Sequence, residues 1–401
     1  MRDQHNDRPT LSRSRRRFLA TTVFLMAVLH LYIGWRLLPD LGLNGTGWAA
    51  CVVFLIVSTW MIPLGLAARF LIRSISLADR VTWFGALLLG LFSSLLVLTV
   101  LRDIALIVLP QVYRHDSAWV VAGLAALVTL IGYINARRIP RVAHVTVPIA
   151  DLPAPLHGFT IAQITDLHVG PTIKRPYVVG VVERLNALKA DVIAVTGDLV
   201  DGEVEALRPH IAPLAGMSAR HGVFAVTGNH EYYSGVGPWV AEFERLGMRV
   251  LMNEHAVLEH DGAPLIIAGV TDFTAAQFDA THASDPSGAL AGSPAGVTPA
   301  ILLAHQPRTA PAAAEAGFDL QLSGHTHGGQ FWPWSLFVPL QQPFTAGLHR
   351  LGSLWIYTPA AVPDTGGRPS GLVRRRKSRC LGWSRPFRRL DESLASPARA
   401  R

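Results

Sequence analysis

Cysteine is scarce in this chain of 401 residues, which contains only Cys51 and Cys380. This number excludes a disulfide framework and a metal site built from thiolates. Charged residues are also few, at 16% of the chain, whereas 50% of the residues are hydrophobic and the mean hydropathy is +0.31. A composition this apolar is unusual for a soluble protein, so part of the chain is expected to lie in a membrane.

Charge is absent from four long stretches near the N-terminus. They are Phe18–Trp35, Trp48–Ala68, Val81–Leu101 and Ala118–Ala136. Each has 18 to 21 residues without Lys, Arg, Asp or Glu, which is long enough to cross a bilayer as a helix. We therefore predict a basic N-terminus over residues 1–17, a region of four transmembrane helices over residues 18–136 and a linker over residues 137–158.

Arginines are distributed unevenly between the two ends of these stretches. They concentrate in the N-terminus, in the second loop (Arg69, Arg73, Arg80) and after the fourth stretch (Arg137, Arg138, Arg141). By the positive-inside rule, both termini and the soluble half are expected in the cytoplasm, with the chain spanning the membrane several times. Alternatively, "SRRRFLA" at Ser14–Ala20 resembles a twin-arginine export signal, which would place the soluble half on the exported side.

Excess positive charge is confined to the C-terminus. From Tyr357 onward there are eleven Lys and Arg against three Asp and Glu, so this segment carries the whole net charge of +8. The remainder of the chain is neutral, which indicates no basic groove and no nucleic-acid partner despite a pI near 10.0.

After Arg141 the pattern changes to short apolar runs between Gly-rich turns. The runs are "FTIAQIT", "DVIAVTG", "GVFAVTG", "PLIIAGVT", "AILLAHQ" and "FDLQLSG". Such runs suit strands that are covered on both faces, and the helical patterns at Val178–Leu188 and Trp239–Leu246 lie between them. We predict a layered α/β domain, with Thr274–Val297 as a surface insertion or flexible loop.

Side chains that bind metals follow nearly every predicted strand. They are Asp166, His168, Asp198, Asn229, His230, His305, His325 and His327. Because residues two apart in an extended segment point to the same side, Asp166 with His168, and His325 with His327, can aim at a shared centre. Imidazole and carboxylate donors without thiolates suit Mn, Fe, Zn or Ni.

The ordered motifs D-x-H, G-D-x-x-D, G-N-H-E, a single His and G-H-x-H resemble those of the calcineurin-like metallophosphoesterases. The sequence G-H-T-H-G-G-Q at Gly324–Gln330 resembles the bacterial membrane-associated branch of that superfamily. The resemblance covers roughly Phe159–Tyr357. It implies a two-layer β-sandwich flanked by helices over residues 159–357, with two divalent metal ions, Mn²⁺ first among them, between the strand ends.

The resemblance also assigns roles to individual positions. One metal would take Asp166, His168 and His327, and the other would take Asn229, His305 and His325. Asp198 would bridge the two ions, and His230 would be the catalytic acid. Glu231 is expected to orient its neighbours, whereas Asp201 and Asp272 at strand ends either support ligands or cap loops.

The implied activity is hydrolysis of a phosphate ester or pyrophosphate by a metal-activated hydroxide. "GGQFWPWSLFVPL" at Gly328–Leu340 is either a buried element or a surface for an acyl chain or the headgroup layer, so a lipid-linked or nucleotide-lipid substrate is one hypothesis. A non-catalytic membrane scaffold or sensor is the alternative function. The predicted spans contain no acidic residue or charge pair that would support a transporter.

The C-terminal tail, residues 358–401, departs from the family pattern. Members of this branch typically continue with a segment like S-R-G-x-G-x-W-G-P-P-x-R, but here Pro, Gly and a run of Arg appear. Codons exist for Tyr357–Arg379 that encode such a segment in a shifted frame. We therefore hypothesise a frameshift near codon 357, with a basic solvated tail as the alternative.

Overall fold

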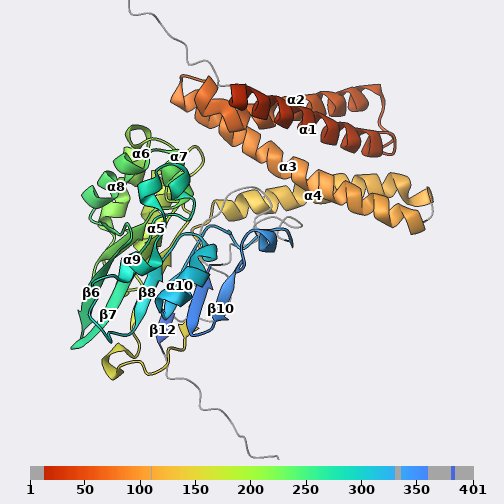
Figure 1. Ribbon diagram of the computed structural model, residues 1–401. Coiled ribbons are helices and arrows are strands. Elements are labelled where there is room, and N and C mark those ends of the chain that lie inside the picture. Colours follow the sequence, from red (N-terminus) through yellow and green to blue (C-terminus); the bar gives the residue numbers. More distant parts are fainter. Residues whose placement is uncertain (1–12, 110, 330–335, 360–380, 384–401) are drawn as a thin grey trace, which may run out of the picture.

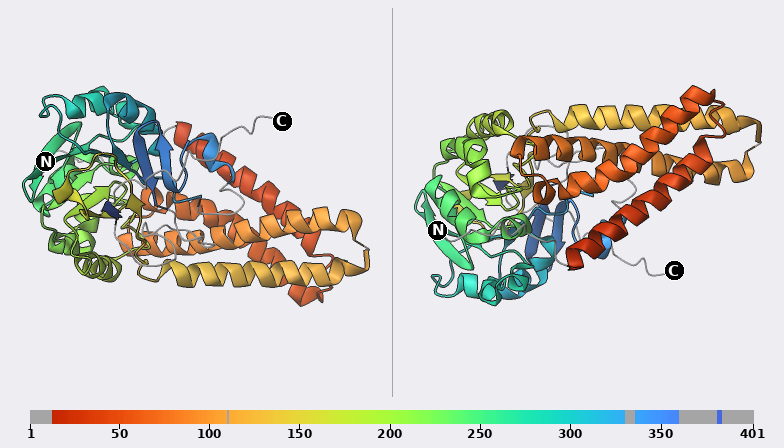
Figure 2. Two further views of the ribbon diagram at one scale, coloured as in Figure 1. Left: turned by 90° about the horizontal axis from the view of Figure 1, so that it is seen from below. Right: turned by 90° about the horizontal axis from the view of Figure 1, so that it is seen from above.

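The computed structural model describes residues 13–109, 111–329, 336–359 and 381–383. Figure 1 shows two parts, a bundle of long helices and a domain with two β-sheets. The bundle extends to one side of the domain, and the turn between α2 and α3 and the C-terminal end of α4 both lie next to the domain in Figures 1 and 2. One end of the bundle therefore lies against the soluble domain.

Four helices form the bundle: α1 (Arg13–Leu37), α2 (Gly45–Leu71), α3 (Ile75–Val108) and α4 (Arg114–Ala136). All four are long and apolar enough to cross a membrane, as the sequence predicts. Helix α3 is longer than the predicted stretch at Val81–Leu101 because its charged residues continue the helix and are paired. Arg36 holds Asp103 at 2.7 Å, and Arg102 binds the Asp40 carboxylate. These charged residues follow the predicted stretch Val81–Leu101, and their pairs join the end of α3 to α1 and to the loop after α1.

Small residues allow α2 and α3 to approach closely. A Cβ placed on Gly65 would lie 2.9 Å from Cα of Gly85, and a Cβ on Gly85 would lie 2.8 Å from the carbonyl oxygen of Met61. Only glycine fits at such a crossing, which is the usual way that membrane helices gain van der Waals contact. The two helices therefore approach closely where Gly65 faces Gly85.

Two six-stranded sheets make up the soluble domain. The first has the order β1 (Thr146–Val147), β12 (Leu381–Trp383), β2 (Thr160–Ile164), β3 (Val192–Thr196), β4 (Val223–Val226) and β5 (Arg249–Val250). The second has the order β10 (Gly347–Leu351), β11 (Leu354–Thr358), β9 (Leu320–Leu322), β8 (Ala300–Leu303), β7 (Ala263–Gly269) and β6 (Glu254–His260). Strands β2 to β5 are parallel, as are β7, β8, β9 and β11.

Apolar side chains form a core between the sheets and a further core on each outer face. The inner core includes Phe159, Phe224 and Leu303. Helices α5 (Arg175–Asn186), α6 (Val204–Ile211) and α8 (Val236–Arg245) cover the first sheet, while α9 (Pro286–Leu290) and α10 (Ala310–Ala316) cover the second. The domain is the predicted two-layer sandwich flanked by helices, because its strands are apolar on both faces.

The segment Thr274–Val297 is not a featureless loop, because it contains α9 and buries Ala289 in the outer core. In the tail, Leu381–Trp383 forms β12 between β1 and β2. The remaining residues on which the frameshift hypothesis depends, 360–380 and 384–401, lie outside the described part of the chain.

Candidate metal centre

The predicted ligands lie together at one edge of the sandwich. Asp166 and His168 follow β2, Asp198 follows β3, Asn229 begins the short helix α7 (Asn229–Tyr233) after β4, His305 follows β8, and His325 and His327 follow β9. Since the carboxyl ends of parallel strands share an edge, both sheets deliver their polar loops to the same place. Residues up to 161 positions apart in the sequence thereby become neighbours.

The backbone is strained at five of these positions. Asp166, His168, Asp198, His325 and His327 have positive φ angles between 48° and 68°. Side chains other than glycine rarely adopt this region, and the cost of about 1–3 kcal/mol for each must be offset by the surrounding structure. Such strain is common at functional sites because it aims side chains where a relaxed backbone would not.

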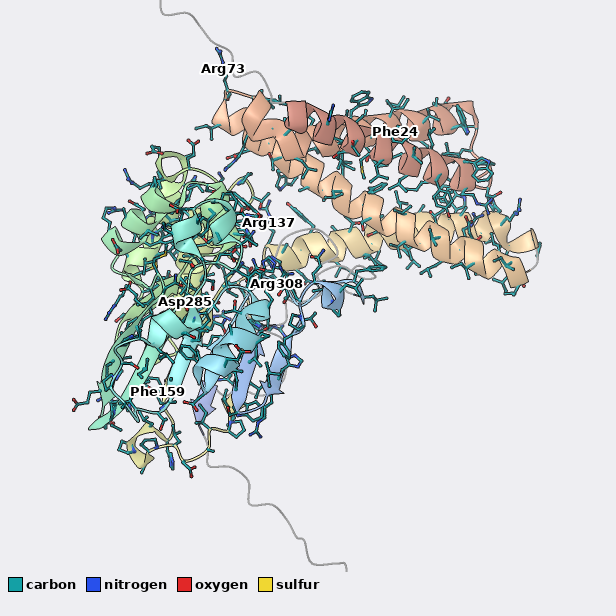
Figure 3. All side chains as sticks on the ribbon, viewed as in Figure 1. Phe24, Arg73, Arg137, Phe159, Asp285 and Arg308 are labelled. Carbon is teal, nitrogen blue, oxygen red and sulfur yellow. The ribbon has the colours of Figure 1, made fainter. Side chains whose placement is uncertain are left out.

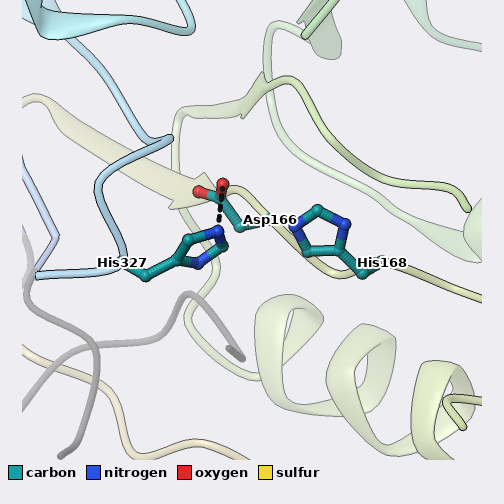
Figure 4. Close-up of side chains that lie close together, drawn as sticks. All are labelled: Asp166, His168 and His327. Carbon is teal, nitrogen blue, oxygen red and sulfur yellow. Dashed lines mark ion pairs between the residues drawn. The ribbon is translucent and has the colours of Figure 1, made fainter. Parts of the chain in front are cut away.

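One group of potential ligands comprises Asp166, His168 and His327, whose ligand atoms lie within 4.8 Å of one another. Figure 4 shows the carboxylate of Asp166 between the two imidazoles. Nε2 of His327 is 3.5 Å from Oδ1 of Asp166. The other side of this carboxylate is fixed by Thr165, whose hydroxyl donates at 2.6 Å, and by the backbone N–H of His325 at 3.1 Å.

A second group comprises Asp198, His305 and His325, again within 4.8 Å. Oδ2 of Asp198 lies 3.1 Å from Nε2 of His305, and 3.9 Å from Nε2 of His168 in the first group. Nδ1 of His305 donates to the carbonyl oxygen of Thr196 at 2.7 Å, which fixes the ring so that Nε2 faces Asp198. Asp198 therefore stands between the two groups.

Two buried polar atoms point to the group that this site would take. Oδ1 of Asn229 and Nδ1 of His327 are buried and have no hydrogen-bond partner among the described residues. Leaving such atoms without a partner costs about 1–3 kcal/mol each. An amide oxygen and an imidazole nitrogen are both good ligands for divalent transition metals, so the residues present fit a metal at this place.

The buried carboxylates of the site shift the pKa values of the neighbouring histidines. Burial disfavours a charged His168, but the carboxylates of Asp201, Asp198 and Asp166 outweigh it and raise its pKa to about 9. The pKa of His305 is also raised, because the carboxylate of Asp198 outweighs the effect of burial. By contrast, burial lowers the pKa of both His325 and His327 to about 4, which keeps these imidazoles neutral and able to bind a cation.

Asp201 connects His168 with His230. Its Oδ1 lies 3.0 Å from Nδ1 of His168 and 2.5 Å from Nδ1 of His230. Because an ionised carboxylate only accepts hydrogen bonds, each imidazole donates through Nδ1 and presents Nε2 to the site. The His230 side chain is 35% exposed, against 6% for His168, so of the two it is the one that a bound substrate can reach.

Glu231 fixes the backbone of the loops that carry Asp198 and Asn229 and is not one of the potential metal ligands. It is fully buried and accepts backbone N–H groups from Gly228 at 2.7 Å, Asp198 at 2.9 Å and Leu199 at 2.8 Å. Burial and the neighbouring Asp198 raise its pKa to about 7. Asp272 accepts from both Thr274 and Gln306, so it caps its own turn and also supports the residue that follows His305.

Glycines permit the close approach of these loops. A Cβ on Gly228 would lie 2.2 Å from Oδ1 of Asp198, and one on Gly324 would lie 2.0 Å from Oγ1 of Thr165. Neither distance is possible for a carbon atom, so G-N-H-E and G-H-x-H need a glycine as their first residue for space.

The sequence indicates only a topological role for Arg69, but the structure brings this residue next to Asp201. Its guanidinium donates to the carbonyl oxygen of Asp201. The two residues are 132 positions apart, and no periodicity or motif connects them. Only the packing of the bundle against the domain could have revealed the contact.

Comparison with known proteins agrees with this geometry. Residues 159–329 match the family model described as "Calcineurin-like phosphoesterase". A "Transmembrane protein with metallophosphoesterase domain" from Danio rerio is 36% identical over 262 residues, 63% of this chain and 59% of that protein. The protein of the same name from Bos taurus is 40% identical over 243 residues, 57% of this chain and 54% of that protein.

A bacterial relative matches at a similar level. An "Uncharacterized metallophosphoesterase" from Helicobacter pylori is 38% identical over 199 residues, 49% of this chain and 52% of that protein. The chain thus spans between half and three fifths of the length of these relatives. Four apolar helices and transmembrane relatives together place the chain in a membrane.

Proposed function

Since residues 159–329 belong to the calcineurin-like phosphoesterase family, we propose that this chain is a membrane-anchored hydrolase of a phosphate ester or pyrophosphate with a dinuclear metal centre. The observation that carries the proposal is the position of Asp198 between two groups of ligand-type side chains. A carboxylate has two oxygens and can therefore serve two ions at once. A scaffold without catalysis would not need this convergence of strained residues.

Each group would hold one divalent ion. Asp166, His168 and His327 would bind the first, Asn229, His305 and His325 would bind the second, and Asp198 would bridge them. Mn²⁺ is the first ion to test, followed by Fe, Zn and Ni, because the donors are oxygen and imidazole nitrogen. Two such ions would supply hydroxide at neutral pH and neutralise the phosphoryl oxygens.

His230 would protonate the departing oxygen. Its Nδ1–H is held by Asp201 at 2.5 Å, which fixes the ring and directs Nε2 toward the reacting group. When Nε2 carries a proton, it can pass this proton to the leaving alkoxide or phosphate. The partial exposure of the ring gives a substrate access to that nitrogen, and Asp201 acts as the orienting group.

Exposed apolar side chains near the site favour a lipid-linked substrate. The rings of His230 and Tyr233 are 5.3 Å apart, and Tyr233 lies 5.6 Å from Phe278; Tyr233 and Phe278 are 63% and 51% exposed. The short helix η8 (Val338–Leu340) and Leu336 expose further apolar surface, with Leu340 81% exposed. In Figure 1, η8 projects from the domain toward the bundle, and such a surface suits an acyl chain.

The described part of Gly328–Leu340 is thus not a buried core element; residues 330–335 lie outside the description.

We further propose that the chain resides in a bacterial inner membrane with residues 159–357 in the cytoplasm. Support comes from the arginines at the end of the bundle that faces the domain: Arg69 and Arg73 on one side, and Arg137 and Arg138 on the other.

A hydrolysis panel tests the proposal. Detergent-solubilised full chain, reconstituted with Mn²⁺, is assayed on a soluble phosphodiester, a phosphomonoester and a nucleotide-lipid pyrophosphate. Turnover of at least one class is expected, with the lipid-linked substrate preferred. Turnover of the soluble esters alone would reject the lipid hypothesis, and no turnover of any class with metal bound would favour the scaffold or sensor.

A further inference from the structure

The turn between α2 and α3 makes polar contacts with the catalytic domain. Arg69, in the last turn of α2, donates through Nη1 to the carbonyl oxygen of Asp201 and through Nη2 to Asp79 of α3 at 3.3 Å. Asp79 also accepts from Lys174, just before α5, at 2.6 Å. These three side chains are between 15% and 32% exposed, so water only partly screens their charges.

Asp201 is the residue that orients two imidazoles of the site. Its side chain holds Nδ1 of His168 and of His230, and its backbone N–H donates to Val169 at 2.9 Å. Its carbonyl oxygen, in contrast, is held from the bundle by Arg69. The peptide that carries Asp201 is therefore fixed by the catalytic domain on one side and by the membrane region on the other.

The neighbouring Gly202 shows how closely Arg69 approaches. A Cβ on Gly202 would lie 2.0 Å from Nη1 of Arg69, and the residue has a φ of +149°. Gly202 is itself held by Ser234, whose Oγ accepts its N–H at 3.1 Å, and by Trp239, whose indole N–H donates to its carbonyl at 2.9 Å. The guanidinium thus occupies the space that a side chain at position 202 would fill. The hydrogen bonds with Ser234 and Trp239 hold the backbone of Gly202 in place.

From this arrangement we propose that Arg69 is a positioning residue through which the membrane helices set the orientation of Asp201, and hence of His168 and His230. The inference rests on the proposed hydrolase function. It gives the bundle a role beyond anchoring, because a change in the packing of α2 on α3 would move Arg69 relative to Asp79 and to the loop that carries Asp201. The carboxylate of Asp79 keeps Arg69 directed at the loop while binding Lys174 of the domain.

The test uses the full chain in lipid nanodiscs with Mn²⁺. The variants are Arg69→Ala, Arg69→Lys and, as matched control, Arg73→Ala. Arg73 lies in the short connection between α2 and α3 and points away from the domain, as Figure 3 shows, and it is exposed. Four quantities are measured: kcat, KM, bound metal, and hydrogen exchange of the backbone amides of residues 199–204, which reports on the loop without requiring activity.

Arg69→Ala is expected to lower kcat by about 10- to 100-fold, because small misplacement of a catalytic group is costly. Its KM should stay within about twofold and both metals should remain bound, since Arg69 touches neither. Exchange over residues 199–204 should rise. Arg69→Lys should recover part of kcat, because an ammonium can still donate to the Asp201 carbonyl, and Arg73→Ala should match the wild type.

Equal kcat and equal exchange in Arg69→Ala and Arg73→Ala would overturn the inference. If the wild type hydrolyses nothing, the proposed function fails, and the exchange measurement alone then decides whether Arg69 holds the loop. An inactive wild type with unchanged exchange in Arg69→Ala would reject both.

Discussion

At the scale of single residues, the site depends on tight packing around Asp198. Asp198 receives the N–H of His230 on Oδ1 at 2.9 Å and faces His305 on Oδ2 at 3.1 Å. Gly228 lies directly against the same carboxylate. The direction of Asp198 is therefore set by the absence of a side chain as much as by the bonds it makes.

Gly228→Ala is expected to displace Asp198 and so to reduce metal binding, because the new Cβ would lie 2.2 Å from Oδ1. Overpacking of this kind costs about 1–3 kcal/mol. Metal content and thermal unfolding of the purified variant are the measurements. Gly237→Ala is the matched control, since a Cβ at Gly237 has nothing within 4 Å; a normal metal content in Gly228→Ala would show that Asp198 is not confined as described.

At the scale of elements, the crossing of α2 and α3 holds the membrane region together and positions the turn that carries Arg69. Gly65 and Gly85 make the crossing possible, because their Cα atoms occupy space that other residues would fill with side chains. The pairs between Arg36 and Asp103 and between Arg102 and Asp40 fix the opposite end.

Gly65→Leu should separate α2 from α3 and lower the thermal stability of the bundle in detergent. Gly123→Leu on α4 serves as the control, because a Cβ there has nothing within 4 Å. Unfolding followed by circular dichroism at helical wavelengths measures the difference. Equal unfolding temperatures for the two variants would contradict the close crossing.

Elements with a strong local pattern could be predicted from the sequence, whereas those defined by distant partners could not. The six apolar runs correspond to β2, β3, β4, β7, β8 and β9, because burial on both faces leaves a continuous apolar signal. Strand β10 is half-buried with His349 and Arg350 in it, so its pattern is weak. The motifs predicted which ligand-type side chains lie together, but the positive φ angles and the contact of Arg69 with Asp201 arise only from tertiary packing.

At the scale of the whole molecule, the α2–α3 turn, the end of α4 and the catalytic domain lie on one side of the bundle (Figures 1 and 2). The arginines of the short loops concentrate at that end, and by the positive-inside rule this favours a cytoplasmic location for the end of the bundle and for the domain beside it. A reporter that is active only in the cytoplasm, fused after Arg141, is expected to be active. A reporter that is active only in the periplasm should be inactive there, and its activity would restore the export reading of Ser14–Ala20.

The account as a whole depends on two metal ions bridged by Asp198, with His230 as a group that binds neither. Bound metal and turnover measured on the same Mn²⁺-reconstituted samples test this most directly. The wild type should hold two ions for each chain, Asp198→Asn should lose metal and turnover together, and His230→Asn should keep both ions while losing most turnover. A His230→Asn variant without metal, or an Asp198→Asn variant that keeps both ions and full turnover, would contradict the account.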